Sequence, residues 1–230
     1  MDKIQIIEKL FYHIVAYSYL ILPLALFAMK EKRGISFVIG IYGAIVCLLL
    51  NLFNYLPLIA KLVYLNLYTL LEYLFFSYLL FSSIQTKKLK NIIIFFSICF
   101  AIFQISIYFL NSKIHRLDSI SVGIETILIF IYIFLFFYDH SKTNKVGYIY
   151  YHPTFFQSVG ILLYLGGSFF FNILANYMSD DEFNTYWHYT YFAEILKNLL
   201  FLVAMLITSR QHKPNSINQS QVPYLDIDMN

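Results

Sequence analysis

Long apolar runs separated by short polar segments are the dominant pattern along this chain. A transmembrane helix needs about 20 mostly apolar residues to cross a hydrocarbon core of about 30 Å. Seven stretches are long enough, and they lack the alternation of polar and apolar residues that marks the strands of a membrane β-barrel. The pattern therefore predicts an all-α membrane protein, a bundle of seven transmembrane helices. The predicted spans are Phe11–Met29, Ile35–Tyr55, Leu58–Ile84, Ile92–Leu110, Leu117–Tyr138, Pro153–Tyr177 and Thr185–Ser209.

The spans define one transmembrane domain, residues 1–209, followed by a polar stretch at 210–230. That stretch contains Pro214 and Pro223 and is predicted to be a disordered tail. The first apolar run resembles a signal peptide because Lys3 and Lys9 precede it. It is too long for a usual signal-peptide core, and no small-residue cleavage motif follows, so we interpret it as the first span.

Basic residues between the spans predict how the bundle crosses the membrane. One side would carry ten of them and the other side four, and cytoplasmic loops are the ones enriched in Lys and Arg. The N-terminus is then outside and the tail is cytoplasmic. The ten are Lys30, Lys32, Arg33, Lys87, Lys88, Lys90, Lys142, Lys145, Arg210 and Lys213, and the four are Lys3, Lys9, Lys113 and Arg116.

Composition agrees with a membrane protein and excludes other classes. The chain is 60% hydrophobic and 13% charged, whereas a soluble domain is about 25% charged. It is too apolar to be disordered and has too little polar surface for a soluble fold. A net charge of +3 is too small to indicate a basic surface that binds nucleic acid. Cys47 and Cys99 lie in apolar runs, where they are expected to be small hydrophobic side chains and neither a disulfide nor a metal pair.

Four ionisable residues lie inside predicted spans: Glu72, Glu125, Glu194 and Lys197. A charge at the centre of a membrane helix costs about 2.5 to 3.5 kcal/mol, so such residues usually face the bundle interior and have a partner. Their spans, the third, fifth and seventh, run in the same direction, and a rise of about 1.5 Å per residue places all four at similar depth. Glu194 and Lys197 are three residues apart and can pair directly.

Each of these spans also has a polar face. The arrangement predicts an outward-opening pocket between the third, fifth and seventh helices, in which two of the glutamates need a proton, a cation, a ligand or Lys61 for charge balance. The alternative is that these residues only join helices by hydrogen bonds, at about 0.6 kcal/mol per contact. The candidate binding residues are Glu72, Glu125, Glu194, Lys197, Lys61, Tyr68, Tyr191 and Asn198.

Enzyme chemistry has little support in the sequence. Nucleophile-elbow, zinc-protease and phosphate-loop motifs are missing, so no catalytic residue, cofactor or metal is predicted, and whether the protein is an enzyme stays open.

Three segments resemble a group of uncharacterised seven-helix membrane proteins typical of Bacteroidetes. They are YTLLEYLFFSYLLF at 68–81, HPTFFQSVGILLYLGGSFFF at 152–171 and YFAEILKNLLFLVAM at 191–205. The resemblance implies a bacterial inner-membrane location, a multi-pass topology and a sensory or regulatory setting, without a known activity.

The chain is also similar to the microbial rhodopsins in its size, its seven spans, a Lys in the seventh span and a Glu in the third. That similarity implies retinal on Lys197 as a Schiff base, with Glu72 and Glu194 as counterions. The sequence departs from the rhodopsin pattern, because the carboxylate precedes Lys197 by three positions instead of four and no Arg precedes Glu72. The tryptophans that hold retinal are also missing, since Trp187 is the only one.

Three hypotheses about function follow. The first is a receptor-like or regulatory membrane protein that binds a small ligand or ion in the charged pocket and acts through a cytoplasmic signalling partner. The second is a proton-coupled transporter, and the third is the retinal protein. Membrane lipid is the expected surrounding in each case, and nucleic acid is not an expected partner.

Overall fold

The computed structural model describes residues 3–29, 34–53, 55–110, 119–143 and 152–211. Within these residues it contains seven α-helices, each long and apolar enough to span a membrane. The prediction of an all-α, seven-helix membrane protein is confirmed. The helices are α1 (Lys3–Ala28), α2 (Ile35–Phe53), α3 (Leu58–Ser83), α4 (Lys87–Leu110), α5 (Ser119–Thr143), α6 (Pro153–Leu174) and α7 (Asp180–Gln211).

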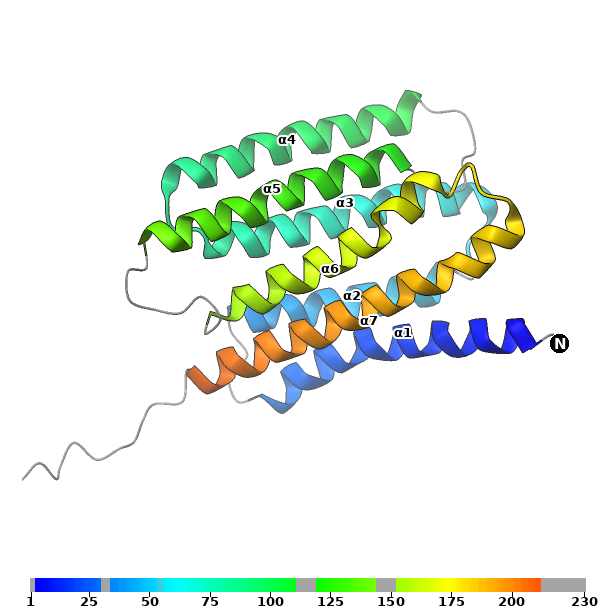
Figure 1. Cartoon of the computed structure of the whole chain (residues 1–230), viewed down its shortest axis with the longest axis horizontal. Helices are drawn as coiled ribbons and strands as arrows, with labels where there is room; N and C mark the ends of the chain where they lie inside the picture. Colours follow the sequence, from blue (N-terminus) through cyan, green and yellow to red (C-terminus); the bar gives the residue numbers. More distant parts are fainter. Residues whose placement is uncertain (1–2, 30–33, 54, 111–118, 144–151, 212–230) are drawn as a thin grey trace, which may run out of the picture.

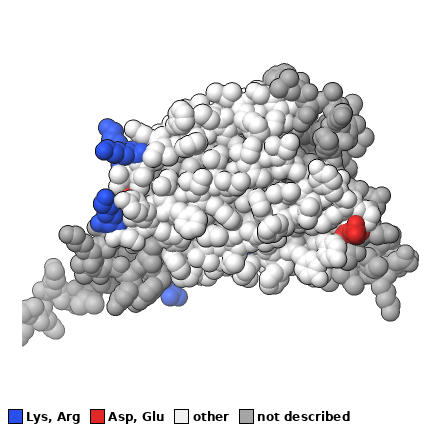
Figure 2. All heavy atoms as spheres, turned by 45° about the horizontal axis from the view of Figure 1, so that its top comes forward, with Lys and Arg blue, Asp and Glu red and all other residues white. Residues whose placement is uncertain are grey.

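Successive helices run in alternating directions along one bundle axis, so α1 begins at one end and α7 finishes at the other (Figure 1). The described Lys and Arg side chains gather at the end where α4 begins and where α5 and α7 finish, with an acidic group at the opposite end (Figure 2). The exposed charges that the structure describes are therefore separated between the two ends. Which end faces the cytoplasm stays a prediction.

Close helix contacts position two residues of the candidate site. Helix α7 packs most extensively against α6, and α1 packs against α2 and α7. A Cβ atom at Gly160 would lie 3.4 Å from the backbone oxygen of Lys197, and one at Gly43 would lie 2.8 Å from the backbone oxygen of Tyr19. Small residues let membrane helices approach closely. These two glycines therefore bring the backbones that carry Lys197 and Tyr19 against their neighbours.

Several helices are longer than the apolar runs that predicted them. Helix α1 begins at Lys3 and α4 at Lys87, before the predicted starts at Phe11 and Ile92. Hydropathy detects the part of a helix that lies in hydrocarbon, whereas backbone hydrogen bonding continues past it. Helix α7 continues to Gln211, and the rest of the predicted tail, residues 212–230, lies outside the described residues.

A capping box explains why α7 begins at Asp180, five residues before the predicted span. The Ser179 backbone N–H and hydroxyl donate to Glu182 Oε2 at 3.0 and 2.9 Å, and Ser179 Oγ accepts from the Glu182 N–H at 3.3 Å. This reciprocal pair satisfies N–H groups that have no partner within the helix. The same hydrogen bonds from Ser179 hold the pKa of Glu182 below its usual value.

The outer faces of the helices suit contact with lipid. Large apolar side chains are exposed on every helix, for example Phe27, Leu48, Phe134 and Phe170. A soluble protein would rarely expose so much contiguous apolar surface. The inner faces meet in one core that includes several tyrosines, such as Tyr19 and Tyr42. Polar chemistry is therefore concentrated inside the bundle.

Candidate functional site: a tyrosine-lined ion pair

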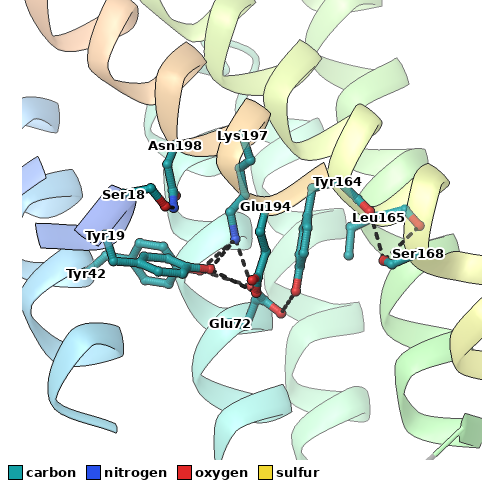
Figure 3. Close-up of polar contacts among 10 residues, drawn as sticks. All are labelled: Ser18, Tyr19, Tyr42, Glu72, Tyr164, Leu165, Ser168, Glu194, Lys197 and Asn198. Carbon is teal, nitrogen blue, oxygen red and sulfur yellow. Dashed lines mark hydrogen bonds and ion pairs between the residues drawn. The ribbon is translucent and has the colours of Figure 1, made fainter. Parts of the chain in front are cut away.

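Lys197 of α7 is completely buried at the centre of the bundle. Its ammonium Nζ donates to the hydroxyl of Tyr19 at 3.0 Å, to the hydroxyl of Tyr42 at 3.2 Å and to Glu72 Oε1 at 3.3 Å (Figure 3). An ammonium group has three N–H donors. All three donors of Lys197 are thus used, and they join α7 to α1, α2 and α3.

Aromatic rings enclose the same ammonium group. Its nitrogen lies 3.7 Å from the ring centroid of Tyr164 and 5.2 to 5.5 Å from the rings of Tyr19, Tyr42 and Phe76. Such cation–π contacts are electrostatically attractive and become stronger when the cation is desolvated. We call Tyr19, Tyr42 and Tyr164 the tyrosine cage. The cage partly replaces the water that Lys197 loses on burial.

Glu72 of α3 is the ion-pair partner of Lys197 and is itself buried. Its Oε1 atom also accepts from the Tyr42 hydroxyl at 3.0 Å, and its Oε2 atom accepts from the Tyr164 hydroxyl at 3.1 Å. A buried ion pair offsets its desolvation cost only when further hydrogen bonds satisfy both partners. Here both carboxylate oxygens are hydrogen-bonded, so the pair is well accommodated.

Glu194 joins the site through a tyrosine and not through Lys197 directly. The Tyr19 hydroxyl donates to Glu194 Oε1 at 3.2 Å and accepts from Lys197. The direct pairing of Glu194 with Lys197, expected from their spacing on one helix, is therefore replaced by an ion pair to Glu72 across the bundle. The physical reason is that the Tyr19 hydroxyl bridges the two side chains of α7.

Glu125 of α5 lies near Glu72 and Lys197 but is not part of their hydrogen-bonded group. It is 1% exposed and within electrostatic range of Glu72 and Lys197. Among the residues that the structure describes, no group donates a hydrogen bond to its Oε1 atom. A buried carboxylate without a counter-charge or hydrogen bond is unfavourable. Glu125 is thus the least compensated acidic group of the predicted set.

The other predicted site residues lie around the ion pair or apart from it. Asn198 is buried and donates through Nδ2 to Ser18 Oγ at 2.9 Å, which joins α7 to α1. Tyr68, one turn before Glu72, stacks on Tyr64 with ring centroids 6.2 Å apart. Tyr191 meets the ring of Trp187 edge-on at 6.0 Å. Both tyrosines are half-buried.

Lys61 lies within α3, but its side chain is outside what the structure describes, so its predicted role is not tested. Of the eight predicted residues, the structure joins Glu72, Glu194, Lys197 and, through a hydrogen bond with Tyr19, Tyr68 in one hydrogen-bonded group. The sequence did not identify the tyrosine cage. Its members come from α1, α2 and α6, whereas the predicted pocket lay between the third, fifth and seventh helices. A tyrosine in mid-span is a usable signal because its buried hydroxyl needs a partner. With 21 tyrosines in the chain, that signal does not single out three.

A second buried tyrosine network joins α3 to α4 and α5, and all its members are neutral. The Tyr73 hydroxyl is 2.9 Å from the Tyr132 hydroxyl and 3.1 Å from Ser97 Oγ. We call Tyr73, Ser97 and Tyr132 the α4-side network, because it joins α3, α4 and α5. Neutral hydrogen bonds of this kind are ordinary contacts between membrane helices.

Two further polar features lie at the end of the bundle where α4 begins. Asp139 near the end of α5 accepts from the backbone N–H groups of Gln85 and Thr86 at 2.6 and 3.4 Å and from the Thr86 hydroxyl. This carboxylate satisfies the backbone N–H groups of the two residues that precede α4. The rings of His140 and His152 lie 5.4 Å apart, and burial, with His140 nearby, lowers the pKa of His152. Neither feature extends to the tyrosine cage.

The described residues contain no group of three or more His, Cys, Asp or Glu side chains that could hold a metal ion. No protein-family model, curated protein or solved structure matches the chain. The resemblances to the Bacteroidetes-type membrane proteins and to the microbial rhodopsins therefore stay predictions. What the site does has to be argued from its geometry.

Proposed function

We propose that this integral membrane protein is receptor-like or regulatory and binds a small ligand or ion at the charged centre formed by Lys197, Glu72 and Glu194. One observation carries the proposal: side chains from five helices, α1, α2, α3, α6 and α7, meet around a single ammonium group whose donors are all used. A ligand or ion that competes for this group changes the contacts among all five helices at once. A site of this kind couples binding to helix position.

The balance of charge at the centre supports binding of a positively charged species. Three buried or half-buried glutamates, Glu72, Glu125 and Glu194, lie around one lysine. With every carboxylate ionised, the group would have two more negative than positive charges. Uncompensated charges at this depth are costly, so ionisable residues inside a membrane usually have a functional partner. A cation, a proton or a cationic ligand group would supply the missing compensation.

The response would pass to a separate protein. The helices are joined by short segments, and the gap between α1 and α2 is six residues. The end rich in Lys and Arg, which we propose is cytoplasmic, presents Lys87, Lys88 and Arg210 for an acidic surface of a signalling partner. The proposed location is the inner membrane of a bacterium, with lipid around the apolar outer faces.

Glu125 favours a second candidate, a proton-coupled transporter. A buried acid without a hydrogen-bond donor on Oε1 is a natural place for a proton that is bound and released. Proteoliposomes that contain the full chain and a pH-sensitive dye would show substrate-dependent proton flux in the wild type. Glu72→Gln and Glu125→Gln would abolish that flux, whereas Tyr132→Phe would preserve it.

The retinal alternative depends on Lys197 giving up its present contacts. A Schiff base at Nζ would replace at least two N–H bonds, and all three N–H groups donate to Tyr19, Tyr42 and Glu72 in this structure. The test is simple. A visible absorption band after addition of retinal to the purified protein, absent from Lys197→Met, would favour the retinal protein over the receptor.

Thermal unfolding of the purified full chain in lipid nanodiscs tests the receptor proposal. A library of monovalent cations, divalent cations and small cationic metabolites is added one at a time. We expect at least one to raise the melting temperature of the wild type and of Tyr132→Phe, the matched control outside the site. The same compound should leave Glu72→Gln and Glu194→Gln unshifted. If every compound and ion shifts all four proteins equally, the charged centre is not a binding site and the proposal is wrong.

A further inference from the structure

The hydrogen bonds around Lys197 form a continuous chain between two carboxyl groups. The ammonium donates to Tyr19 at 3.0 Å, and Tyr19 donates onward to Glu194 at 3.2 Å. In the other direction the ammonium donates to Tyr42 at 3.2 Å, and Tyr42 donates onward to Glu72 at 3.0 Å. We call these five residues the relay. Both of its arms have the same chemistry, an ammonium, a tyrosine hydroxyl and a carboxyl group.

The relay contains one positive charge and two groups that can be negative. The ammonium can balance one carboxylate, and a second carboxylate at this depth is unfavourable unless it is neutralised. The balanced state therefore has one proton on either Glu72 or Glu194. The two sites for this proton are linked through the hydroxyls of Tyr19 and Tyr42, which both donate and accept hydrogen bonds, and through the Lys197 ammonium, which donates to both of them.

We propose that Glu72 and Glu194 share one proton through Tyr19, Lys197 and Tyr42, so that the ion handled at the charged centre is the proton. The inference rests on the proposed function, because it names the ion and the regulation of the same site. It predicts two states of equal net charge. In one state the carboxylate is on α3, and in the other it is on α7.

The transfer balances without any other reactant. Lys197 passes one ammonium proton to the Tyr42 oxygen while Tyr42 passes its hydroxyl proton to Glu72, which becomes the neutral acid. The Tyr19 hydroxyl, which donates to Glu194 in this structure, then rotates to donate to the lysine amine, and the neutral Glu194 acid donates to Tyr19. The amine takes the hydroxyl proton of Tyr19, and Tyr19 takes the acid proton of Glu194. At the end Lys197 is again an ammonium group, both tyrosines are again neutral, and Glu194 is the carboxylate. One proton has moved from α7 to α3.

The two states differ in which helices the ion pair joins. With the charge on Glu72, Lys197 ties α7 to α3, as in this structure. With the charge on Glu194, the pair lies within α7 at a spacing of three residues, where direct contact is possible. Within the described residues α3 and α7 make few direct helix contacts. The position of the proton therefore decides whether α3 and α7 are held together.

Other titratable groups near the relay determine which of its two glutamates holds the proton. Tyr164 of α6 donates to Glu72 Oε2, which favours the carboxylate on α3. Tyr68 of α3 lies one turn before Glu72, and Glu125 of α5 is within electrostatic range of Glu72 and Lys197. Ionisation of Glu125 would repel a nearby carboxylate. Glu194 is half-buried, whereas Glu72 is buried, so Glu194 is the more accessible of the two acid groups.

Infrared spectroscopy of the full chain in nanodiscs tests the relay, with Glu125→Gln as the background so that its acid group does not contribute. The C=O stretching band of a neutral carboxylic acid should show two components, from Glu72 and Glu194. Tyr19→Phe breaks the relay but leaves both acids, and we expect one component to remain. Glu72→Gln and Glu194→Gln should each abolish the whole band, because the remaining carboxylate then pairs with Lys197.

A single component that is identical in the background protein and in Tyr19→Phe would overturn the shared proton. A band that survives in Glu72→Gln would also overturn it, since Glu194 would then hold its proton independently of the ion pair. The circular dichroism spectrum of each variant shows whether it is folded, and Tyr132→Phe is the matched tyrosine control. The outcome is separate from the thermal-shift test. If the infrared band has one unchanged component but a compound still raises the melting temperature, only the shared proton is rejected. If the band has two components but no compound raises the melting temperature, only ligand binding is rejected.

Discussion

The bundle contains two buried tyrosine networks that both include a residue of α3, and they differ in charge. The α4-side network is built from Tyr73, Ser97 and Tyr132, all neutral, with hydroxyl distances of 2.9 and 3.1 Å. The tyrosine cage has contacts of similar length but surrounds an ammonium and a carboxylate. Both networks hold helices together, yet only the second requires ions to be desolvated.

The α4-side network can be explained by helix packing alone, whereas the charges of the tyrosine cage cannot. Neutral hydrogen bonds between membrane helices contribute about 0.6 kcal/mol each, and apolar residues could replace them at little cost. A buried ion pair is no better for stability than well-packed hydrophobic residues of similar volume. The cage therefore adds little stability that an apolar core could not supply. Its charges are accounted for by the binding or switching role that we propose.

The largest expected effect comes from breaking the ion pair on one side. Lys197→Met leaves Glu72 buried without its counter-charge, which should lower the free energy of unfolding by about 3 to 5 kcal/mol. Unfolding in mixed micelles with a denaturing detergent measures the loss. The double variant Glu72→Gln with Lys197→Met removes both charges and should recover most of it. A double variant as unstable as Lys197→Met would show that lost packing, and not the unpaired charge, causes the effect.

A smaller change of opposite sign is expected at Gln157 of α6. This side chain is completely buried, and within the described part of the chain neither amide atom has a hydrogen-bond partner. Leaving a buried polar group unsatisfied costs about 1 to 3 kcal/mol, so Gln157→Leu should raise the free energy of unfolding by a similar amount. The same unfolding assay measures it. A loss of stability would contradict this prediction and show that Gln157 makes favourable contacts that leucine does not replace.

The smallest effect should come from the neutral network. Tyr132→Phe removes the hydroxyl that contacts Tyr73 and should lower the free energy of unfolding by about 0.6 kcal/mol. Cage variants such as Tyr42→Phe remove a contact to both Lys197 and Glu72 and should cost more. Equal losses in Tyr132→Phe and Tyr42→Phe would remove the contrast between the two networks.

Much of the architecture could be predicted from the sequence because a lipid environment imposes a strong rule. Every backbone polar group in hydrocarbon must be satisfied within the chain, so a long apolar run has to be a helix. The predicted starts of α2, α3 and α6 agree with the structure, at Ile35, Leu58 and Pro153. Ends that extend past the hydrocarbon were predicted less well. Helix α7 begins earlier than expected because the capping box at Ser179 and Glu182 starts it.

The candidate site could be predicted only in part. A charged residue within a span is conspicuous, and Glu72, Glu194 and Lys197 were identified from that feature alone. The cage tyrosines were not identified, because tyrosines are frequent in this chain and a hydroxyl within a span readily finds a hydrogen-bond partner. The structure also places Glu125 apart from the hydrogen-bonded group, although its depth along α5 is similar. Depth along a helix follows from sequence, whereas the partner of a side chain does not.

The sequence by itself determined that the chain forms seven membrane helices and that four ionisable side chains lie deep within three of them. The reason is local, because hydropathy and the rise of a helix need no knowledge of neighbouring helices. Only the tertiary structure decided that Lys197 pairs with Glu72 instead of Glu194. That choice depends on where Tyr19 and Tyr42 lie, more than 150 residues away in the sequence, and on the close helix contacts at Gly43 and Gly160.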